Sequence, residues 1–277
     1  MTDEGNRKRE ESRRVFSEAA SIYDRVGPPI FSHFGQRLVD VSAISLGANV
    51  LDVAAGRGAV LFPVAAKVGS SGRVMGIDFS AAMVKETAKD IASRKIANAE
   101  IRQMDAEQMM FDDAAFDCVT CGFAVWMFAE PARVLQEFRR VLRPGGQVAL
   151  STWAVDNPAQ TWCHEVLRPF VAATASQQLA KDLRFDTPLQ LETLLRHSGF
   201  EDIQITIEEM EFVYRSEEQY WSSLWSSGLR RPLEKMTADL LVQAKSEVLR
   251  KFQSFRRPDG FHRLSRALFA CAKKPTM

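Results

Sequence analysis

The sequence has few cysteines, no long apolar run and almost no net charge. Its 277 residues include four cysteines, too few for a disulfide framework. The longest nearly apolar run, residues 118–129, is shorter than a membrane-spanning helix requires. The N-terminus is charged throughout and lacks the apolar core of a signal peptide. We therefore expect a cytoplasmic protein without stable membrane insertion.

The charge balance also argues against one class of partner. With 36 Lys+Arg and 35 Asp+Glu, the net charge of +1 provides no bulk positive field for nucleic acid. The 46% hydrophobic and 26% charged residues are typical of a globular protein. The length predicts one large domain, or one domain with a substantial insertion. We expect no nucleic-acid partner.

Short apolar runs alternate with helical patterns through the middle of the chain. The expected strands are residues 49–53, 73–77, 99–104, 116–121 and 147–152. Such alternation predicts parallel strands joined by helices that cover the sheet. Two later strand patterns complete the prediction of an α/β fold. It is a Rossmann-like, seven-stranded, mostly parallel sheet with helices on both faces, an antiparallel last strand and a helical lid.

Three regions follow from this pattern. Residues 1–48 are expected to form N-terminal helices that cover the cofactor and acceptor site. Residues 49–154 are expected to form the cofactor-binding core. Residues 155–277 are expected to complete the sheet with strands 203–213 and 265–273. The lid is expected in two insertions, residues 155–186 and 214–260.

The turn after the first expected strand carries the clearest chemical pattern, LDVAAGRG. Gly56 and Gly58 let the backbone pass close to a ligand beyond the carboxyl ends of the strands. Asp78 ends the second strand, where a carboxylate can accept hydrogen bonds from a ribose diol. After the third strand, Asp105 and the backbone N–H of Ala106 suit the edge of an adenine. These positions predict an adenosine site.

Two phosphate-binding patterns are missing. The G-x-G-x-x-G of a dinucleotide site is absent, because Leu61 stands at its last position. No Gly-Lys-Ser/Thr of a Walker A loop occurs. An adenosine ligand without phosphates remains. Asp52 either orients the glycine turn through backbone hydrogen bonds or touches the ligand, and the sequence leaves both readings open.

Together these segments resemble the class I S-adenosylmethionine-dependent methyltransferases, most of all the ubiquinone/menaquinone-biosynthesis type with its many small-molecule enzymes. The matching segments are LDVAAGRG (51–58), GIDFS (76–80), MDAEQMMF (104–111), FDCVTCGFAVWMF (116–128) and RVLRPGG (140–146). The resemblance implies that S-adenosylmethionine is the cofactor and S-adenosylhomocysteine the product. It also implies a small-molecule acceptor.

The resemblance assigns roles residue by residue. Gly56 and its neighbours would lie under the methionine part, and Asp78 would bind the ribose hydroxyls. Phe79 and Met83 would flank adenine, while Asp105 and Ala106 would contact its edge. The full set of expected cofactor-binding residues is Tyr23, Asp52, Ala54, Gly56, Gly58, Asp78, Phe79, Met83, Asp105, Ala106 and Phe123, with Phe123 near the sulfonium and Tyr23 closing the site from above.

The sequence departs from the family pattern at two places. Ala54 stands where relatives often have glycine, and we expect its φ to be negative so that alanine is tolerated. Trp126 and Met127 stand where relatives often carry histidines. Histidine-assisted chemistry from that loop is therefore in doubt.

Few residues are available as a general base. The candidates for a catalytic role are His164, Tyr23 and His33, although a lone histidine is more often structural. The tryptophans either pack the lid onto the core or wall an acceptor pocket. The expected acceptor-binding residues are Trp126, Trp153, Trp162, Trp221 and Trp225. No metal site is expected, because Cys118 and Cys121 should point to opposite faces of one strand.

These residues indicate methyl transfer to carbon or oxygen of a small apolar or aromatic molecule, such as an indole, phenol or quinol of specialised metabolism. Quinone-precursor C-methylation is an alternative. A protein that binds S-adenosylmethionine without methylating is an alternative of another class. The sequence leaves the acceptor atom and the oligomeric state open.

Overall fold

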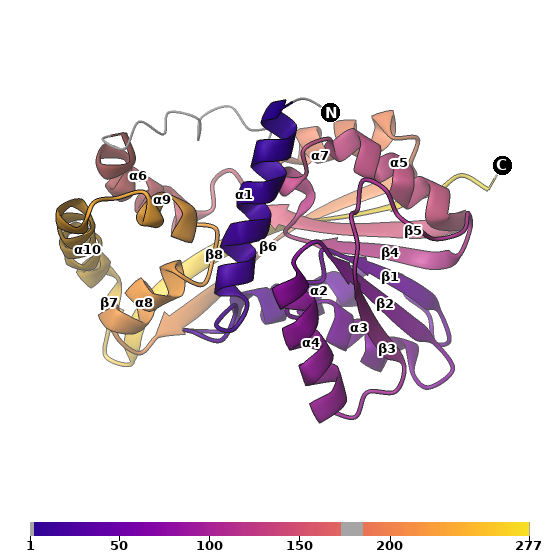
Figure 1. Ribbon diagram of the computed structural model, residues 1–277, viewed down its shortest axis with the longest axis horizontal. Coiled ribbons are helices and arrows are strands. Elements are labelled where there is room, and N and C mark those ends of the chain that lie inside the picture. Colours follow the sequence, from indigo (N-terminus) through magenta and orange to yellow (C-terminus); the bar gives the residue numbers. More distant parts are fainter. Residues whose placement is uncertain (1–2, 173–184, 277) are drawn as a thin grey trace.

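One mixed sheet organises the chain (Figure 1), and the computed structural model describes residues 3–172 and 185–276. The strand order is β3-β2-β1-β4-β5-β8-β6, with the two-residue β7 paired to β8. β1 to β5 run parallel, and β8 is antiparallel to both β5 and β6. The strands are β1 (Asn49–Val53), β2 (Arg73–Asp78), β3 (Ala99–Gln103), β4 (Phe116–Gly122), β5 (Leu142–Trp153), β6 (Glu201–Tyr214), β7 (Arg256–Arg257) and β8 (Gly260–Lys273). The predicted fold class is confirmed.

Helices bury apolar residues against both faces of the sheet. One buried cluster joins α2 and α3 to one face, and another joins α5 and α7 to the opposite face. Cys118 belongs to the first cluster and Cys121 to the second, so their side chains lie on opposite faces as expected. The helices are α1 (Asp3–Ala19), α2 (Ile30–Val41), α3 (Leu61–Val68), α4 (Ala81–Ser93), α5 (Pro131–Val141), α6 (Pro158–Ala172), α7 (Pro188–His197), α8 (Glu217–Leu224), α9 (Arg230–Glu234) and α10 (Ala238–Phe252).

A third apolar cluster lies beside the sheet. Residues of α6, α8 and α10 pack there with Phe261 of β8, and Trp162, Trp221 and Trp225 belong to it. Figure 1 shows these helices gathered at one end of the molecule, away from β1, β2 and β3. Residues 173–184 of the expected lid lie outside the described residues. Within the described chain, helix length and hydropathy give no candidate for a membrane span.

Local sequence accounts for several helix ends. Ser80 caps α4 by accepting a hydrogen bond from the Met83 backbone N–H at 3.2 Å. Thr187 caps α7 in the same way through the N–H of Gln190. Pro131 begins α5 at its first turn, as predicted. Ser80 matters for the site, because its cap fixes α4 directly after Asp78.

Candidate cofactor site

A cavity opens at the carboxyl ends of β1, β2 and β4, where open α/β sheets bind ligands. Its empty volume is about 870 Å³, counting the part open to solvent. Residues of α1 line it, and Figure 1 shows α1 crossing in front of the sheet. The lining residues are Arg9, Ser12, Arg13, Phe16, Tyr23, Ala54, Gly56, Ile77, Asp78, Phe79, Ser80, Met83, Met104, Asp105, Ala106, Glu107, Gly122, Phe123, Ala124, Met127 and Phe128.

Asp78 holds the glycine turn at the floor of this cavity. Its Oδ2 accepts the Gly56 backbone N–H and its Oδ1 accepts that of Ser80, both at 2.8 Å. The Thr87 hydroxyl donates to the Gly56 carbonyl at 2.6 Å and fixes the turn from the α4 side. A carboxylate oxygen has two lone pairs, so each oxygen of Asp78 keeps one for a further donor. A ribose diol can supply two such donors.

Ala54 contradicts the expectation of a negative φ. Its φ is +55°, in the left-handed region that favours glycine. The turn requires this conformation because two hydrogen bonds fold it over the end of β2: Ala55 N–H to the Ile77 carbonyl at 3.0 Å, and Gly56 N–H to Asp78. Phe123, after β4, also has a positive φ of +54°. Strained backbone thus lies on two sides of the cavity.

Asp52 and Gly58 lie behind the lining. Asp52 is buried, and its Oδ1 accepts the Thr120 hydroxyl at 2.8 Å. Burial, together with the negative charge of Asp78, raises the pKa of Asp52 to about 7. At Gly58 a Cβ would come within 2.4 Å of the Phe62 ring, so this glycine makes room for a side chain. The Thr120 contact joins β1 to β4 and does not involve the glycine turn, so both readings of Asp52 stay predictions.

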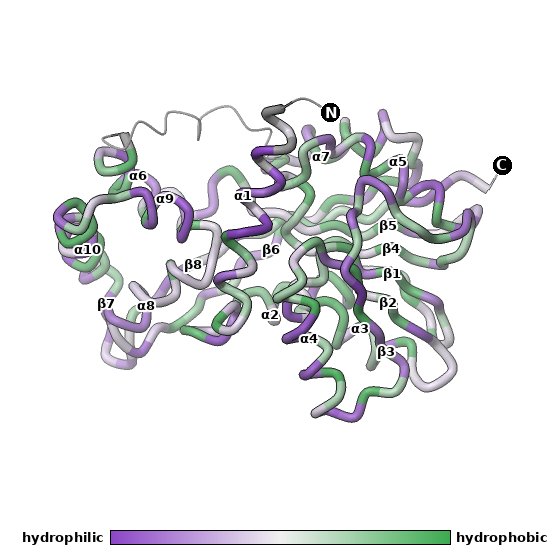
Figure 2. Tube along the Cα trace, in the orientation of Figure 1, coloured by the Kyte–Doolittle hydropathy of each residue, from purple (hydrophilic) through white to green (hydrophobic). Residues whose placement is uncertain are grey.

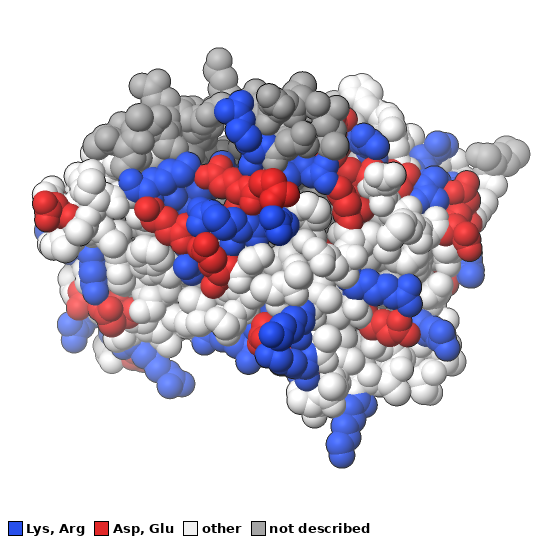
Figure 3. All heavy atoms as spheres, viewed as in Figure 1, with Lys and Arg blue, Asp and Glu red and all other residues white. Residues whose placement is uncertain are grey.

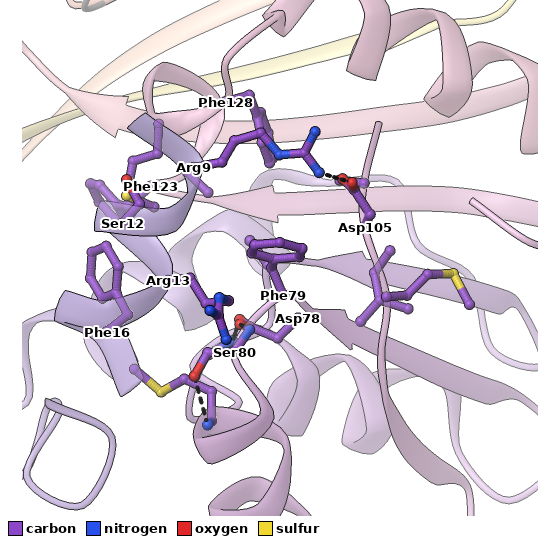
Figure 4. A pocket seen from close by; sticks show the side chains of 18 of the residues that line it. Arg9, Ser12, Arg13, Phe16, Asp78, Phe79, Ser80, Asp105, Phe123 and Phe128 are labelled. Atoms are coloured by element: carbon purple, nitrogen blue, oxygen red, sulfur yellow. Dashed lines mark hydrogen bonds and ion pairs between the residues drawn. The ribbon is translucent and has the colours of Figure 1, made fainter. Parts of the chain in front are cut away.

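The four residues expected around adenine do come together. Phe79, Met83, Asp105 and Ala106 all line the cavity, beside the end of β2 and the loop after β3. The backbone N–H of Glu107 donates to Asp105 Oδ1 at 2.9 Å, which fixes the carboxylate and turns Oδ2 toward the cavity. Figure 4 shows the Phe79 ring between Asp78 and Asp105. A planar group on this ring can donate to Asp105.

Residues 3–217 match the model of the ubiE/COQ5 methyltransferase family. The chain belongs to this family. Its relatives include the nocamycin O-methyltransferase of Saccharothrix syringae, 32% identical over 85% of this chain and 89% of that protein. The aklanonic acid methyltransferase of Streptomyces sp. (strain C5) is 38% identical over 50% of this chain and 63% of that protein. A demethylmenaquinone methyltransferase of Listeria monocytogenes is 32% identical over 51% of this chain and 62% of that protein.

Solved structures share the fold. A Bacillus halodurans structure named as a methyltransferase has a TM-score of 0.59 at 25% identity, over 87% of this chain and 99% of its own. The [4+2]-cyclase SpnF has a TM-score of 0.55 at 18% identity, over 89% of this chain and 81% of its own. The chain is thus an S-adenosylmethionine-dependent methyltransferase of small molecules.

The cavity of this methyltransferase fits its cofactor. S-adenosylmethionine carries a sulfonium and an ammonium, and the floor of the cavity has excess negative charge. Burial raises the pKa of Asp78, as it does that of Asp52. A cation nearby would lower both pKa values again. Gly56 leaves open space where a Cβ would stand, so the cofactor can pass close to the backbone.

α1 brings four residues to the cavity that the sequence analysis did not select. Arg9, Ser12, Arg13 and Phe16 lie at spacings of three, one and three, which is one face of a helix. This periodicity was available in the sequence, but a charged N-terminal helix usually faces solvent. Figure 4 shows the Arg9 guanidinium above the Phe79 ring, with Ser12, Arg13 and Phe16 to the left of that ring.

The three candidates for a catalytic role are separated in the structure. Tyr23 lines the cavity, and burial raises the pKa of its phenol. His33 of α2 contacts the rings of Phe34 and Phe212, with centroids 5.2 and 5.5 Å away, and does not line the cavity. His164 lies in α6 and does not line it either. Their catalytic roles remain predictions.

The five tryptophans lie outside the cavity lining. Trp153 is one layer behind it, with its ring centroid 4.3 Å from that of Phe123. Trp126 packs against the core next to Met127, which lines the cavity. Trp162, Trp221 and Trp225 belong to the third apolar cluster, beside the sheet. Acceptor binding by tryptophan therefore remains a prediction, while Phe16, Met127 and Phe128 wall the cavity directly.

Proposed function

We propose that this methyltransferase acts on a small, flat, apolar or aromatic molecule of specialised metabolism, at oxygen or at a carbon conjugated with it. The lining of the cavity carries this proposal. The residues assigned to adenosine supply Asp78 and Asp105, and much of the remaining wall is apolar: Phe16, Phe123, Ala124, Met127 and Phe128. Aromatic walls suit flat acceptors. The relative that aligns over most of both chains is named a nocamycin O-methyltransferase.

The chemistry of the acceptor follows from which groups face it. The bound cofactor supplies an activated methyl group on a sulfonium. The chain has to hold the acceptor in line with that group and exclude water. Among the residues described, no histidine lines the cavity, and Tyr23 stays protonated because its pKa is raised. We therefore propose an acceptor that ionises readily itself, as an enol, phenol or carboxylic acid does. The name of a second relative includes such an acid.

Calorimetric titration with S-adenosylhomocysteine tests the assigned cofactor residues. Asp78→Ala removes charged hydrogen bonds of about 1.5–3 kcal/mol, so we expect binding to weaken roughly 10–150-fold. Asp117→Ala is the matched control. Like Asp78, the Asp117 side chain accepts a backbone N–H, that of Asn49 in β1 at 2.8 Å. Asp117 lies at the opposite ends of the strands from the cavity. Equal binding by the wild type and Asp78→Ala would refute the assignment.

A panel of phenols, enols, carboxylic acids and indoles, offered with S-adenosylmethionine, tests the acceptor class. We expect a product one methylene heavier, formed faster from acceptors that are ionised at the assay pH. Quinone-precursor C-methylation is the second candidate, favoured by the demethylmenaquinone methyltransferase relative. Deletion of the gene would then lower quinone content, and unchanged quinones would exclude it.

A non-methylating role is the third candidate. A [4+2]-cyclase shares this fold, so the fold also occurs in a protein named for other chemistry. In this case the cofactor would bind without turnover, and activity would survive its replacement by S-adenosylhomocysteine. Product formation that depends on S-adenosylmethionine would exclude it.

A further inference from the structure

The guanidinium of Arg9 occupies the place assigned to adenine. Arg9 reaches from α1 over the Phe79 ring, with its Cζ 5.3 Å from the ring centroid (Figure 4). One of its terminal nitrogens donates to Asp105 Oδ2 and the other to Glu107 Oε2 at 3.3 Å. The side chain is only 16% exposed. Arg9 thus uses the same ring and the same carboxylate oxygen that the cofactor would use.

Adenine and a guanidinium present similar chemistry to this subsite. Both are planar, both stack on an aromatic face and both donate N–H groups. The other oxygen of Asp105 already accepts the Glu107 backbone N–H at 2.9 Å. Oδ2 is the oxygen turned toward the cavity, so an adenine amino group would approach Asp105 from the side that Arg9 occupies. The face of Phe79 and the space above Asp105 do not hold both planar groups at once.

The attachment of α1 allows such an exchange. Val15 and Ala19 are its only buried apolar residues among the side chains described. Toward α9 it is held by ion pairs, Arg14 to Glu234 at 2.9 Å and Glu11 to Lys235 at 2.9 Å. Toward α4 it is held by a hydrogen bond between the hydroxyls of Ser17 and Ser80 at 2.8 Å. Polar contacts at a surface are individually weak, so α1 can shift without exposing a large apolar face.

Figures 2 and 3 agree with this description. The tube of α1 is largely hydrophilic in Figure 2, in contrast to the strands of the sheet. In Figure 3, basic and acidic side chains alternate in a band across the region of α1 and α9. The ion pairs named above join α1 to α9 and to the residue that follows it. The helix over the cofactor site is therefore attached mainly through charge.

We propose that Arg9 sets cofactor affinity by holding the adenine subsite until the cofactor displaces it. The inference rests on the cofactor site of the proposed function and adds a residue to it. Each binding event includes breaking the contacts of Arg9 with Asp105 and Glu107. Removing the guanidinium removes that step, so binding becomes tighter and association faster. A residue that merely stabilised α1 or touched the bound cofactor would have the opposite effect when removed.

Arg9→Met tests the proposal, because it keeps an apolar stem of similar length without the planar cation. Arg14→Met is the matched control. Arg14 also lies on α1 and pairs with Glu18 and Glu234, at 3.1 and 2.9 Å, but it does not line the cavity. Both variants change the charge of α1 equally. The probe is S-adenosylhomocysteine, with affinity measured by calorimetry and association by stopped flow, so no acceptor is needed.

We expect Arg9→Met to bind S-adenosylhomocysteine about 10-fold more tightly than the wild type, or about 1.4 kcal/mol. Arg14→Met should stay within about threefold of the wild type, below about 0.7 kcal/mol. Added salt screens the ion pair of Arg9 and should reduce the difference between Arg9→Met and the wild type. Arg9→Lys, which keeps the charge but lacks the planar fork, should lie between them.

Two failures can be distinguished. If the wild type binds S-adenosylhomocysteine and Arg9→Met binds it equally or more weakly, the role of Arg9 is refuted while the proposed function stands. If neither protein binds it, although both are folded by circular dichroism, the assigned cofactor site itself is refuted. An equal gain in Arg14→Met would also refute the proposal, because it would point to the charge or the attachment of α1 and not to the adenine subsite.

Discussion

Replacing Ala54 by glycine should relieve backbone strain in the cofactor turn. Ala54 has a φ of +55°, where an L-residue with a Cβ costs about 1–2 kcal/mol relative to glycine. Glycine also increases the freedom of the unfolded chain, which lowers stability by about 0.4–1 kcal/mol. The methyl lost at this half-buried position lowers it further. The net change at Ala54 alone is therefore small, and a single variant cannot isolate the strain.

The adjacent Ala55→Gly supplies the reference. Ala55 is buried and its φ is not positive, so it loses a methyl and gains unfolded-state freedom without strain relief. We expect Ala54→Gly to be more stable than Ala55→Gly by about 1–2 kcal/mol, the strain contribution. Urea denaturation at equal slope m measures this as a difference in midpoint. A difference below about 0.5 kcal/mol, or one of the opposite sign, would refute the strain argument.

Two further predictions concern the same end of the sheet. The pKa of Asp52 is raised to about 7, so the folded state binds its proton more tightly than the unfolded chain does, and the free energy of unfolding falls as pH rises from about 4 to 7. Asp52→Asn should remove this slope and be more stable than the wild type by roughly 1–2 kcal/mol at pH 8, with the gain lost near pH 5; denaturation across that range checks it. Ser80→Ala should lower the free energy of unfolding by about 1 kcal/mol, since it removes the cap on the Met83 N–H. Thr237→Ala removes the cap of α10, far from the cavity. It should lower the free energy of unfolding by a similar amount but leave S-adenosylhomocysteine binding unchanged.

The sequence predicted the parts of the fold that depend on local pattern. Short strand patterns located β1 to β4, and the caps at Ser80 and Thr187 located two helix starts. β5 begins at Leu142, earlier than the expected residue 147. β8 begins at Gly260, earlier than the expected residue 265. The early part of this strand carries His262 and Arg263, so its sequence does not alternate as an apolar strand does. In the structure Arg263 is buried, and His262 pairs with Glu211 and Asp259.

That Asp78, Phe79 and Asp105 line one cavity was predictable, because strand ends in a parallel sheet meet at one edge. They needed only their distance along the chain from the glycine turn. The conformation of Ala54 was not predictable, because it depends on the hydrogen bonds that Ile77 and Asp78 of β2 accept from the turn. The role of α1 was hidden for a different reason. Its inner face is polar, so hydrophobic periodicity could not distinguish a face over a ligand from a face in water.

The basic side chain of Arg9 on α1 complements the carboxylates of the cavity. The cavity gathers carboxylates at Asp78, Asp105 and Glu107, with Asp52 buried behind them, which suits a cationic cofactor. Burial, and after it the negative charge of Asp78, raise the pKa of Asp52, so this end of the site favours a nearby cation. Arg9 supplies the missing positive charge at Asp105 and Glu107 from a helix that is itself held by ion pairs. A site that suits a cationic cofactor is thus stabilised by the guanidinium of Arg9, which leaves the site when α1 shifts.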